Sequence, residues 1–315
     1  MSRLVVDLGG TNCRLALAKG GRPLTAVQSY QNAKFTGFSA LLSHYLAETD
    51  RPVISEMVIA VAGPVTGPAT AQKAELTNRG WQLSARDLSR EWGAIPVQLL
   101  NDLSALGHSL ADLKHSDLAV IHATPHPSAQ QGPVVQKLVV GIGTGFNLSP
   151  VFADAQGSNC LKSEYGHVAL PLDLHQALVE QLGAKAADFT TLECCFSGRG
   201  LAALYAAFAP DAAPRSGAQI LAASRHNEVT EFIDFYAGLL ALLSRNLLKG
   251  FLPLGGLYFA GAVARNLLTG PGGSAFVTAY SQRDPKFPDL GAPVFCILED
   301  AAALKGCAGF RFPAA

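Results

Sequence analysis

The sequence predicts an α/β protein of two domains, each built on a sheet that mixes parallel and antiparallel strands. Its 315 residues are enough for about two domains. Three strand patterns follow one another before the first helix pattern, which excludes an all-parallel sheet. A strand, a glycine turn and a second strand occur twice, at 4–18 and at 138–153. This duplicated hairpin indicates one such hairpin in each domain.

The composition narrows the class of protein. Apolar residues make up 49% of the chain and charged residues 15%, which is typical of a globular protein with large cores. The net charge is zero and no run of Lys or Arg occurs, so the sequence supports neither nucleic acid nor a membrane as partner. No secretion signal and no uninterrupted apolar stretch of about 20 residues is found. Six scattered cysteines fit no disulfide framework or zinc site, and predict reduced thiols in a cytoplasmic protein.

Hydrophobic spacing gives the order of the elements. In the first third we expect helices at 37–48 and 103–113, and strands at 4–8, 13–18, 24–30, 57–61, 69–76 and 97–100. From about 115 the strand pattern restarts, with strands at 118–123, 138–142, 148–153, 257–260 and 294–298. Helices are expected at 173–182, 200–208, 228–248, 262–268 and 300–310, and a Gly- and Pro-rich loop at 268–276.

The first glycine turn, Asp7-Leu8-Gly9-Gly10-Thr11-Asn12, lies between two strands. The dinucleotide fingerprint and the Walker loop both need a strand followed by a helix, so both are excluded. Paired glycines let several backbone N–H groups approach an anion, and Asp7 is suited to hold Mg²⁺ through water. The alternative is an ordinary tight turn capped by Thr11. Arg14, on the second strand, either reaches a phosphate or pairs across the strands.

Two more glycine elements follow in the sequence. Gly143-Thr144-Gly145 repeats the hairpin turn, and a strand runs into a helix at Gly261, where a flat ring has room against the backbone. In this order the three elements resemble the phosphate-1, phosphate-2 and adenosine elements of the sugar kinase and actin superfamily. The resemblance implies the two-domain, actin-like ATPase (ribonuclease H-like) fold, with an interdomain cleft.

An acid stands at the start of the helix predicted at 103–113. Asn101 and Asp102 follow a strand directly. A helix N-terminus favours the ionised carboxylate, which is the form that a general base needs. The alternative is a simple N-cap, for which both residue types are favoured.

Further motifs extend the resemblance over nearly the whole chain. The segments "LTNRGW", "SEYGHVALP" and "LECCFSGRGLAALY", together with the elements above, resemble the bacterial glucokinase family from residue 4 to about 310. The resemblance implies a hexokinase-like enzyme of glycolysis that transfers phosphate from ATP, with Mg²⁺, to the 6-hydroxyl of glucose. Members of this family are often dimers, so a homodimer is a further expectation.

The matching motif positions imply which residues form the site. Asp102 is expected to be the general base, and the sugar is expected to contact Asn78, Asn101, Asp102, Glu164, His167 and Glu193. ATP is expected to contact Asp7, Leu8, Gly9, Gly10, Thr11, Asn12, Gly143, Thr144, Gly145 and Gly261. Carboxylates accept hydrogen bonds from neighbouring hydroxyls, while Asn and His fix the direction of others. Taken alone, His167 is more typical of a core histidine and Glu193 of an exposed helix residue.

The chain departs from the family pattern at several positions. Tyr165 stands where the family usually has glycine, Asn147 ends the second turn in place of glycine, and Ala262 follows Gly261 in place of a second glycine. The usual Asn-Pro after the last strand is absent. Two alternatives therefore stay open: a kinase for another hexose, such as mannose, fructose or an amino sugar, and a non-catalytic sugar-sensing protein.

The resemblance also gives the domain limits. We expect a small domain at 1–101, completed by the C-terminal helix at about 300–315, and a large domain at 102–299.

Overall fold

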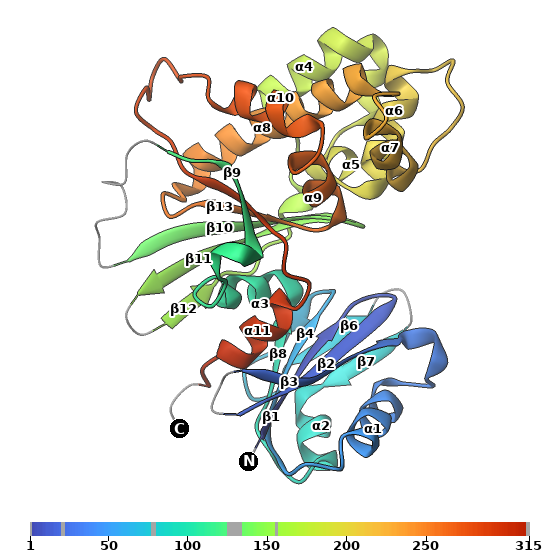
Figure 1. The fold of residues 1–315 in the computed structure, drawn as a ribbon, viewed down its shortest axis with the longest axis vertical. Coiled ribbons are helices and arrows are strands. Elements are labelled where there is room, and N and C mark those ends of the chain that lie inside the picture. The colour runs from blue at the N-terminus through green and yellow to red at the C-terminus, as the bar shows by residue number, and fades with distance from the viewer. Residues whose placement is uncertain (1, 20–22, 77–79, 125–133, 155–156, 313–315) are drawn as a thin grey trace. The chain divides into compact units, whose positions relative to one another are not determined.

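The computed structural model describes residues 2–19, 23–76, 80–124, 134–154 and 157–312 (Figure 1). The chain divides into two compact units, one formed by 1–113 with 300–315 and the other by 114–299. The predicted boundary after residue 101 differs from this division, because α3 (Asp102–Ser109) packs against α11 (Ala302–Gly309) inside the first unit. None of the helices in the described ranges is both long and apolar enough to cross a membrane.

A five-stranded mixed sheet forms the centre of the first unit, in the order β3-β2-β1-β4-β8. Its strands are β1 (Ser2–Leu8), β2 (Asn12–Ala18), β3 (Leu24–Gln31), β4 (Ile54–Val61) and β8 (Val97–Asn101). β1 is antiparallel to β2 and parallel to β4, and β4 is parallel to β8. The predicted combination of parallel and antiparallel pairs is therefore present.

Helices cover both faces of this sheet because its strands are apolar on both sides. Leu4, Val6 and Leu8 of β1 pack with α1 (Phe38–Glu48) and α2 (Ala85–Glu91). Val5, whose side chain points to the opposite face, packs with α3 and α11. The C-terminal helix α11 thus completes the core of a sheet whose first strand starts at residue 2.

A small three-stranded sheet packs at the side of the first unit. Its strands are β5 (Val65–Thr66), β6 (Lys73–Leu76) and β7 (Trp81–Ser84). The strand expected at 69–76 begins only at Lys73, because residues 68–71 form a turn in which Ala71 N–H donates to the Pro68 carbonyl at 2.9 Å.

The second unit contains a six-stranded mixed sheet in the order β12-β11-β10-β13-β14-β9. These strands are β9 (Leu118–His122), β10 (Val135–Ile142), β11 (Phe146–Asp154), β12 (Gly157–Cys160), β13 (Leu257–Ala260) and β14 (Val294–Ile297). β10 is antiparallel to β11 and parallel to β13. This is the arrangement of β1 with β2 and β4, so the hairpin duplication in the sequence is also a duplication in the structure.

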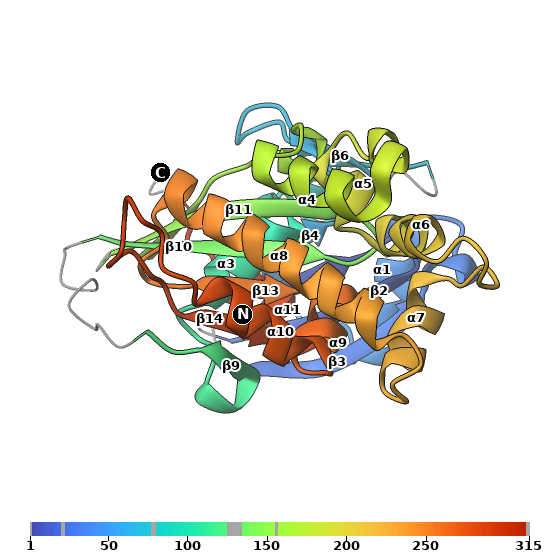
Figure 2. The ribbon, with the colours of Figure 1, turned by 90° about the horizontal axis from the view of Figure 1, so that it is seen from above.

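Seven α-helices pack with this sheet in the described part of the second unit. They are α4 (Leu172–Leu182), α5 (Leu192–Cys195), α6 (Gly198–Phe208), α7 (Gly217–Ser224), α8 (Thr230–Phe251), α9 (Ala262–Leu268) and α10 (Gly272–Tyr280). The long helix α8 lies between α4 and α10 (Figure 2). Its buried face shares one core with Leu138, Val140 and Ile142 of β10.

The prediction of a loop at 268–276 is wrong for residues 272–276, because α10 begins at Gly272. Gly272 lies so close to its neighbours that a Cβ there would be 2.6 Å from Leu267 Cδ1 and 3.2 Å from Ile233 Cγ2. Phe276 and Tyr280 of α10 are buried against α8. Tertiary packing therefore outweighs the low helix propensity of the paired glycines.

Candidate functional site

The parallel strands β1, β4 and β8 end at the same edge of the first sheet. Their register aligns Leu8 with Val61 and Val61 with Asn101. The turn at 9–12 follows β1 at this edge, and α3 begins here directly after β8. Carboxyl ends of parallel strands are where open α/β sheets bind ligands. The topology therefore brings the first glycine turn and Asp102 to one edge of one sheet.

Hydrogen bonds within the first unit hold the first glycine turn. Gly9 N–H donates to the Asn12 carbonyl at 3.0 Å. Asn32, which is fully buried, donates from Nδ2 to the Gly9 carbonyl at 2.8 Å and from its backbone N–H to the Thr11 carbonyl at 2.9 Å. Thr11 and Asn12 are exposed. The buried Asn32 thus holds the backbone of the turn, while the polar side chains of the turn face solvent.

Asp7 lies on β1 just before this turn and pairs with Arg14 across the hairpin. Arg14 Nη1 donates to Asp7 Oδ2 at 3.4 Å, so the cross-strand alternative for Arg14 is confirmed. Burial raises the pKa of Asp7, and the nearby Arg14 offsets part of this rise. Mg²⁺ in phosphate sites takes one or two carboxylates, several waters and the substrate phosphates. A single carboxylate next to a phosphate-type turn fits this ion.

Asn101 and Asp102 form the start of α3. Asn101 is the N-cap, since its Oδ1 accepts from Leu103 N–H at 3.0 Å, and its Nδ2 donates to the Gly63 carbonyl at 3.1 Å. Asp102 Oδ1 accepts from the same N–H at 2.9 Å. Asp102 is partly exposed and lies in the first turn of the helix, where the positive end of the dipole stabilises a negative charge.

The second glycine turn lies in the second unit and is held by close backbone packing. Gly143 N–H donates to the Gly145 carbonyl at 3.0 Å, and Gly198 N–H donates to the Gly143 carbonyl at 2.8 Å. Gly261 has a φ of +95°, and a Cβ there would lie 2.3 Å from the Ile142 carbonyl oxygen. The second turn, the start of α6 and the β13–α9 turn therefore converge on one place, and Gly261 is required for this approach.

Glu193 connects the second turn to α5. Its Oε2 accepts from Phe146 N–H at 3.4 Å and would be 3.1 Å from a Cβ at Gly145. Its Oε1 pairs with Arg199 at 3.1 Å, and the Glu193 side chain is 26% exposed. The carboxylate is thus held beside the turn and still reaches solvent, which is more than the local pattern of an exposed helix residue implies.

Glu164 precedes a short 3₁₀ helix, η4 (Tyr165–His167), that packs on β11, and His167 is its last residue. A Cβ at Gly166 would lie 2.2 Å from the Phe146 carbonyl oxygen, so only glycine allows this contact. Glu164 and His167 are both exposed. The interpretation of His167 as a core histidine is therefore wrong.

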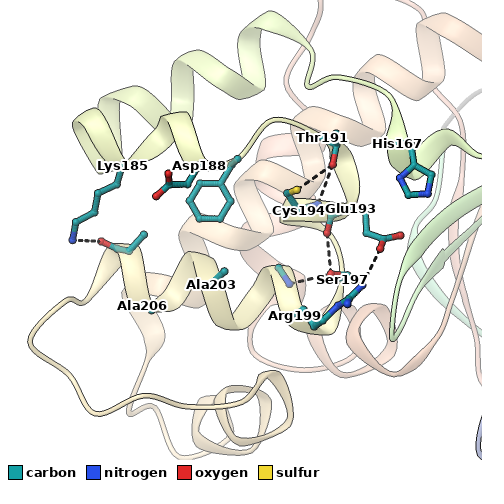
Figure 3. Close-up of a pocket in the computed structure, with 13 residues that line it drawn as sticks. His167, Lys185, Asp188, Thr191, Glu193, Cys194, Ser197, Arg199, Ala203 and Ala206 are labelled. Carbon is teal, nitrogen blue, oxygen red and sulfur yellow. Dashed lines mark hydrogen bonds and ion pairs between the residues drawn. The ribbon is translucent and has the colours of Figure 1, made fainter. Parts of the chain in front are cut away.

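An open cavity of about 710 Å³ lies next to these residues in the second unit (Figure 3). His167 and Glu193 lie at one end of it, and Lys185 lies at the other, where Nζ donates to the Ala207 carbonyl at 3.4 Å. Cys194 also lines the cavity, and the Thr191 hydroxyl that donates to its sulfur lowers the pKa of this thiol. The cavity is large enough for a small organic ligand.

Two of the residues expected at the sugar need separate comment. Asn78 lies outside the described residues. Tyr165, which replaces a glycine of the family pattern, points its ring to Phe251 of α8, with 5.4 Å between the ring centroids. The ring packs against the core of the second unit and does not line the cavity.

Sequence reasoning missed three residues that hold the site together: Asn32, Asn147 and Arg199. Asn32 and Asn147 are polar residues next to or within strands, where an apolar or β-branched residue is more usual. That is a weak signal, because it does not tell which distant group each side chain meets. Arg199 lies within the recognised "SGRG" segment, but its pairing with Glu193 depends on the bend between α5 and α6.

Comparison with known proteins decides the family. The model of the Glucokinase family matches residues 4–311. The chain belongs to the glucokinase family. A glucokinase from Nitrobacter hamburgensis is 29% identical over 319 residues, which cover 97% of this chain and 96% of that protein. The crystal structure of a glucokinase from an Antarctic psychrotroph is 26% identical with a TM-score of 0.82, and 98% of each chain is covered.

Some relatives of this glucokinase family member are longer. A bifunctional protein from Burkholderia thailandensis is 27% identical over 273 residues, which cover 84% of this chain but 41% of that protein. The chain therefore matches less than half the length of these relatives. The predicted bacterial glucokinase family and the actin-like α/β fold with mixed sheets are both confirmed.

Proposed function

We propose that this protein transfers the γ-phosphate of ATP to the 6-hydroxyl of glucose, giving glucose 6-phosphate. One observation carries the proposal beyond family membership. Asp102 begins α3 at the edge of the first sheet where the glycine turn at 9–12 also lies. A base and an anion-binding turn at one sheet edge are the two groups that phosphoryl transfer to an alcohol needs.

Asp102 is the proposed general base. Its carboxylate accepts from Leu103 N–H through Oδ1, and the helix N-terminus keeps it in the ionised form. In the reaction the 6-hydroxyl proton moves to Asp102 as the hydroxyl oxygen attacks the γ-phosphorus. The bond from the γ-phosphorus to the β–γ bridging oxygen breaks, and ADP leaves. Such assistance contributes about 10²- to 10⁴-fold to the rate.

Glu164, His167 and Glu193 are the proposed sugar-binding residues of the second unit, and Asn101 and Asn78 are those of the first. Glu164 and His167 are exposed on η4, and His167 and Glu193 line the same cavity. Two carboxylates accept from neighbouring hydroxyls and the imidazole fixes the direction of another, which suits a hexose ring. Buried polar groups left without partners then disfavour a sugar that lacks a hydroxyl.

The phosphates of ATP are the proposed ligands of the two glycine turns, at Leu8–Asn12 and Gly143–Gly145, and Gly261 is the proposed contact of the adenosine. Backbone N–H groups without a neighbouring Cβ can approach phosphate oxygens closely. Asp7 is the proposed ligand of Mg²⁺ through water. The ion, when bound, neutralises the negative charge that spreads over the transferred phosphoryl group.

The position of Tyr165 removes one objection to glucose as the substrate. Its ring lies against Phe251 and outside the cavity lining, so the replaced glycine does not put a bulky group beside the sugar. The pattern of carboxylates expected for glucokinases is otherwise complete among the described residues.

A panel assay tests the proposal. Purified protein with ATP, Mg²⁺ and single hexoses, followed by coupled detection of ADP, is expected to show the highest kcat/KM with glucose. A higher value with mannose, fructose or glucosamine would identify a kinase for another hexose. Glucose binding without turnover on any hexose would identify a sugar sensor instead.

One substitution tests the proposed base. Asp102→Asn is expected to lower kcat by about 10²- to 10⁴-fold, because the amide accepts no proton, and to leave glucose binding within a few-fold. Calorimetry measures the binding and the coupled assay measures kcat. Asp112→Asn, a change further along the first unit, is the control. Wild-type turnover in Asp102→Asn would remove the assignment.

A further inference from the structure

The side chain of Asn147 joins strand β11 to the segment that carries Glu164. Its Nδ2 donates to the Ser163 carbonyl at 2.6 Å and to Glu164 Oε2 at 3.4 Å. Its Oδ1 accepts from Tyr165 N–H at 3.0 Å and from the Ser163 hydroxyl at 3.1 Å. One amide thus contacts three successive residues of the segment 163–165.

These partners fix which way the amide points. The Tyr165 N–H can only donate and the Ser163 carbonyl can only accept, so Oδ1 must face the first and Nδ2 the second. The donor side of Asn147 is therefore the side that meets Glu164. A donor beside a carboxylate stabilises it, whereas an acceptor in the same place would repel it.

Glu164 needs such support because its side chain is exposed. A free Glu side chain loses rotamer entropy when it is ordered. The backbone beside it is already held, because Gly166 packs directly on the Phe146 carbonyl. The orientation of the carboxylate is left to be set, and Asn147 Nδ2 contacts it at 3.4 Å.

We propose that Asn147 is a positioning residue for the sugar: it holds the Glu164 carboxylate in the orientation that accepts hydrogen bonds from hexose hydroxyls. This inference rests on the proposed function, in which Glu164 binds the sugar. Asn147 acts through Glu164 and so affects the affinity for glucose, while the affinity for ATP stays unchanged. Ordering the carboxylate before the sugar arrives reduces the entropy lost on binding.

Asn147→Asp removes the donor beside Glu164. The introduced carboxylate keeps the three accepted hydrogen bonds, from Leu148 N–H, Tyr165 N–H and the Ser163 hydroxyl. It loses both donations and places a like charge next to Glu164. We expect glucose affinity to fall by about 10- to 100-fold by calorimetry, with KM for ATP close to wild type. A fall in the thermal midpoint measures the separate cost of losing the donation to the Ser163 carbonyl.

Ser149→Ala is the matched control. Ser149 lies two residues further along β11, and its hydroxyl donates at 2.9 Å to the carbonyl of Leu161, just before the same segment. It does not contact Glu164 in the structure, so glucose affinity is expected to stay within about twofold of wild type. Asn147→Ala, which adds no charge, is the second variant if Asn147→Asp does not fold, and its expected loss of glucose affinity is smaller, about fivefold.

A double substitution tests whether Asn147 affects glucose affinity through Glu164. In a Glu164→Gln background, the new amide can donate to the carboxylate introduced by Asn147→Asp, so the hydrogen bond is restored with its direction reversed. The second change is therefore expected to cost much less glucose affinity there than in wild type. If Asn147→Asp lowered glucose affinity by the same factor in wild type and in Glu164→Gln, the inference would be overturned. A wild-type glucose affinity in Asn147→Asp would overturn it as well. If the wild-type protein itself binds no hexose, the proposed function fails instead.

Discussion

The two glycine turns have the same backbone plan but different supports. Each joins two antiparallel strands, and in each sheet the strand before the turn is parallel to the next strand of the sheet. The turn at 9–12 is held by Asn32, a buried and uncharged residue without a proposed role in binding. The turn at 143–145 is held by Gly198 and by Glu193, whose carboxylate we propose to bind the sugar.

This difference predicts that the two turns respond differently to sugar. A change at Glu193 is expected to affect both the proposed sugar contact and the backbone of the second turn, because its Oε2 accepts from Phe146 N–H. A change at Asn32 affects the first turn alone. The two hairpins thus have the same backbone shape, but different kinds of residue support their turns.

Among the variants that test this comparison of the two turns, the largest effect is expected for Glu193→Ala. The substitution removes a proposed sugar ligand and leaves Phe146 N–H without this acceptor, so kcat/KM for glucose should fall by about 100-fold or more and KM for ATP should also rise. Steady-state kinetics with each substrate varied measures both. Glu180→Ala, on the exposed face of α4, is the control. A fall in kcat/KM for glucose with an unchanged KM for ATP would show that the carboxylate does not support the turn.

Asp7→Asn is expected to reduce activity and to stabilise the fold. Loss of an outer ligand lowers apparent Mg²⁺ affinity by about 10- to 100-fold, which a Mg²⁺ titration of the rate measures. Burial raises the pKa of Asp7 in the folded state, so the folded chain binds more protons than the unfolded chain between pH 3.8 and the raised value. Wild-type stability therefore falls as the pH rises through this window.

The asparagine of this variant does not ionise, so this part of the pH dependence should disappear. Urea unfolding at several pH values is expected to show Asp7→Asn gaining stability relative to wild type from pH 4 to pH 7. Asp87→Asn, at an exposed position of α2, serves as control. A constant difference between variant and wild type across this range would contradict the role of burial at Asp7.

Asn32→Ala should weaken ATP binding and spare glucose binding. The partly buried Gly9 carbonyl loses its partner, and the loss of this support is expected to raise KM for ATP by about tenfold. Gln28→Ala, on an exposed position of the neighbouring strand β3, should leave both constants unchanged. An equal rise in KM for glucose would mean that the two turns are not supported independently.

Arg199→Ala is expected to have the smallest effect. Its side chain is 80% exposed, and an exposed ion pair contributes about 0–1 kcal/mol, so KM for glucose should change less than about fivefold. Arg215→Ala, which removes a second exposed ion pair in the same unit, is the comparison. A larger rise in KM for glucose in Arg199→Ala, but not in Arg215→Ala, would indicate that the Arg199 guanidinium contacts the substrate directly.

The hairpins and the position of Asp102 could be predicted because their signals are local. Apolar alternation around paired glycines defines a strand, a turn and a strand within 15 residues, and an Asn-Asp pair after a strand predicts a helix start. The partners of Asn32 and Asn147 could not be predicted in this way. They lie 23 and 16 residues away in the sequence, at Gly9 and Ser163, and only the folded sheet brings them together.

Tyr165 and α10 show that packing partners, too, cannot be predicted from the local sequence. Whether the Tyr165 ring points to a ligand or to the core depends on Phe251, on a helix that begins 65 residues later. The glycines that predicted a loop at 268–276 instead let α10 approach α8 closely. Local propensity describes the backbone of a segment, whereas its neighbours are set by the whole topology.

The contact between β1 and α11 has a consequence for synthesis. Arg3 Nη1 donates to the carbonyls of Cys307, Ala308 and Phe310, so the first strand closes its core with residues that lie about 300 positions later in the sequence. Residues 114–299 are complete before this helix emerges, and domains fold as units during translation. The unit that holds Asp102 therefore needs residues made after the second unit, so we expect the surroundings of the proposed base to form only once α11 has been translated.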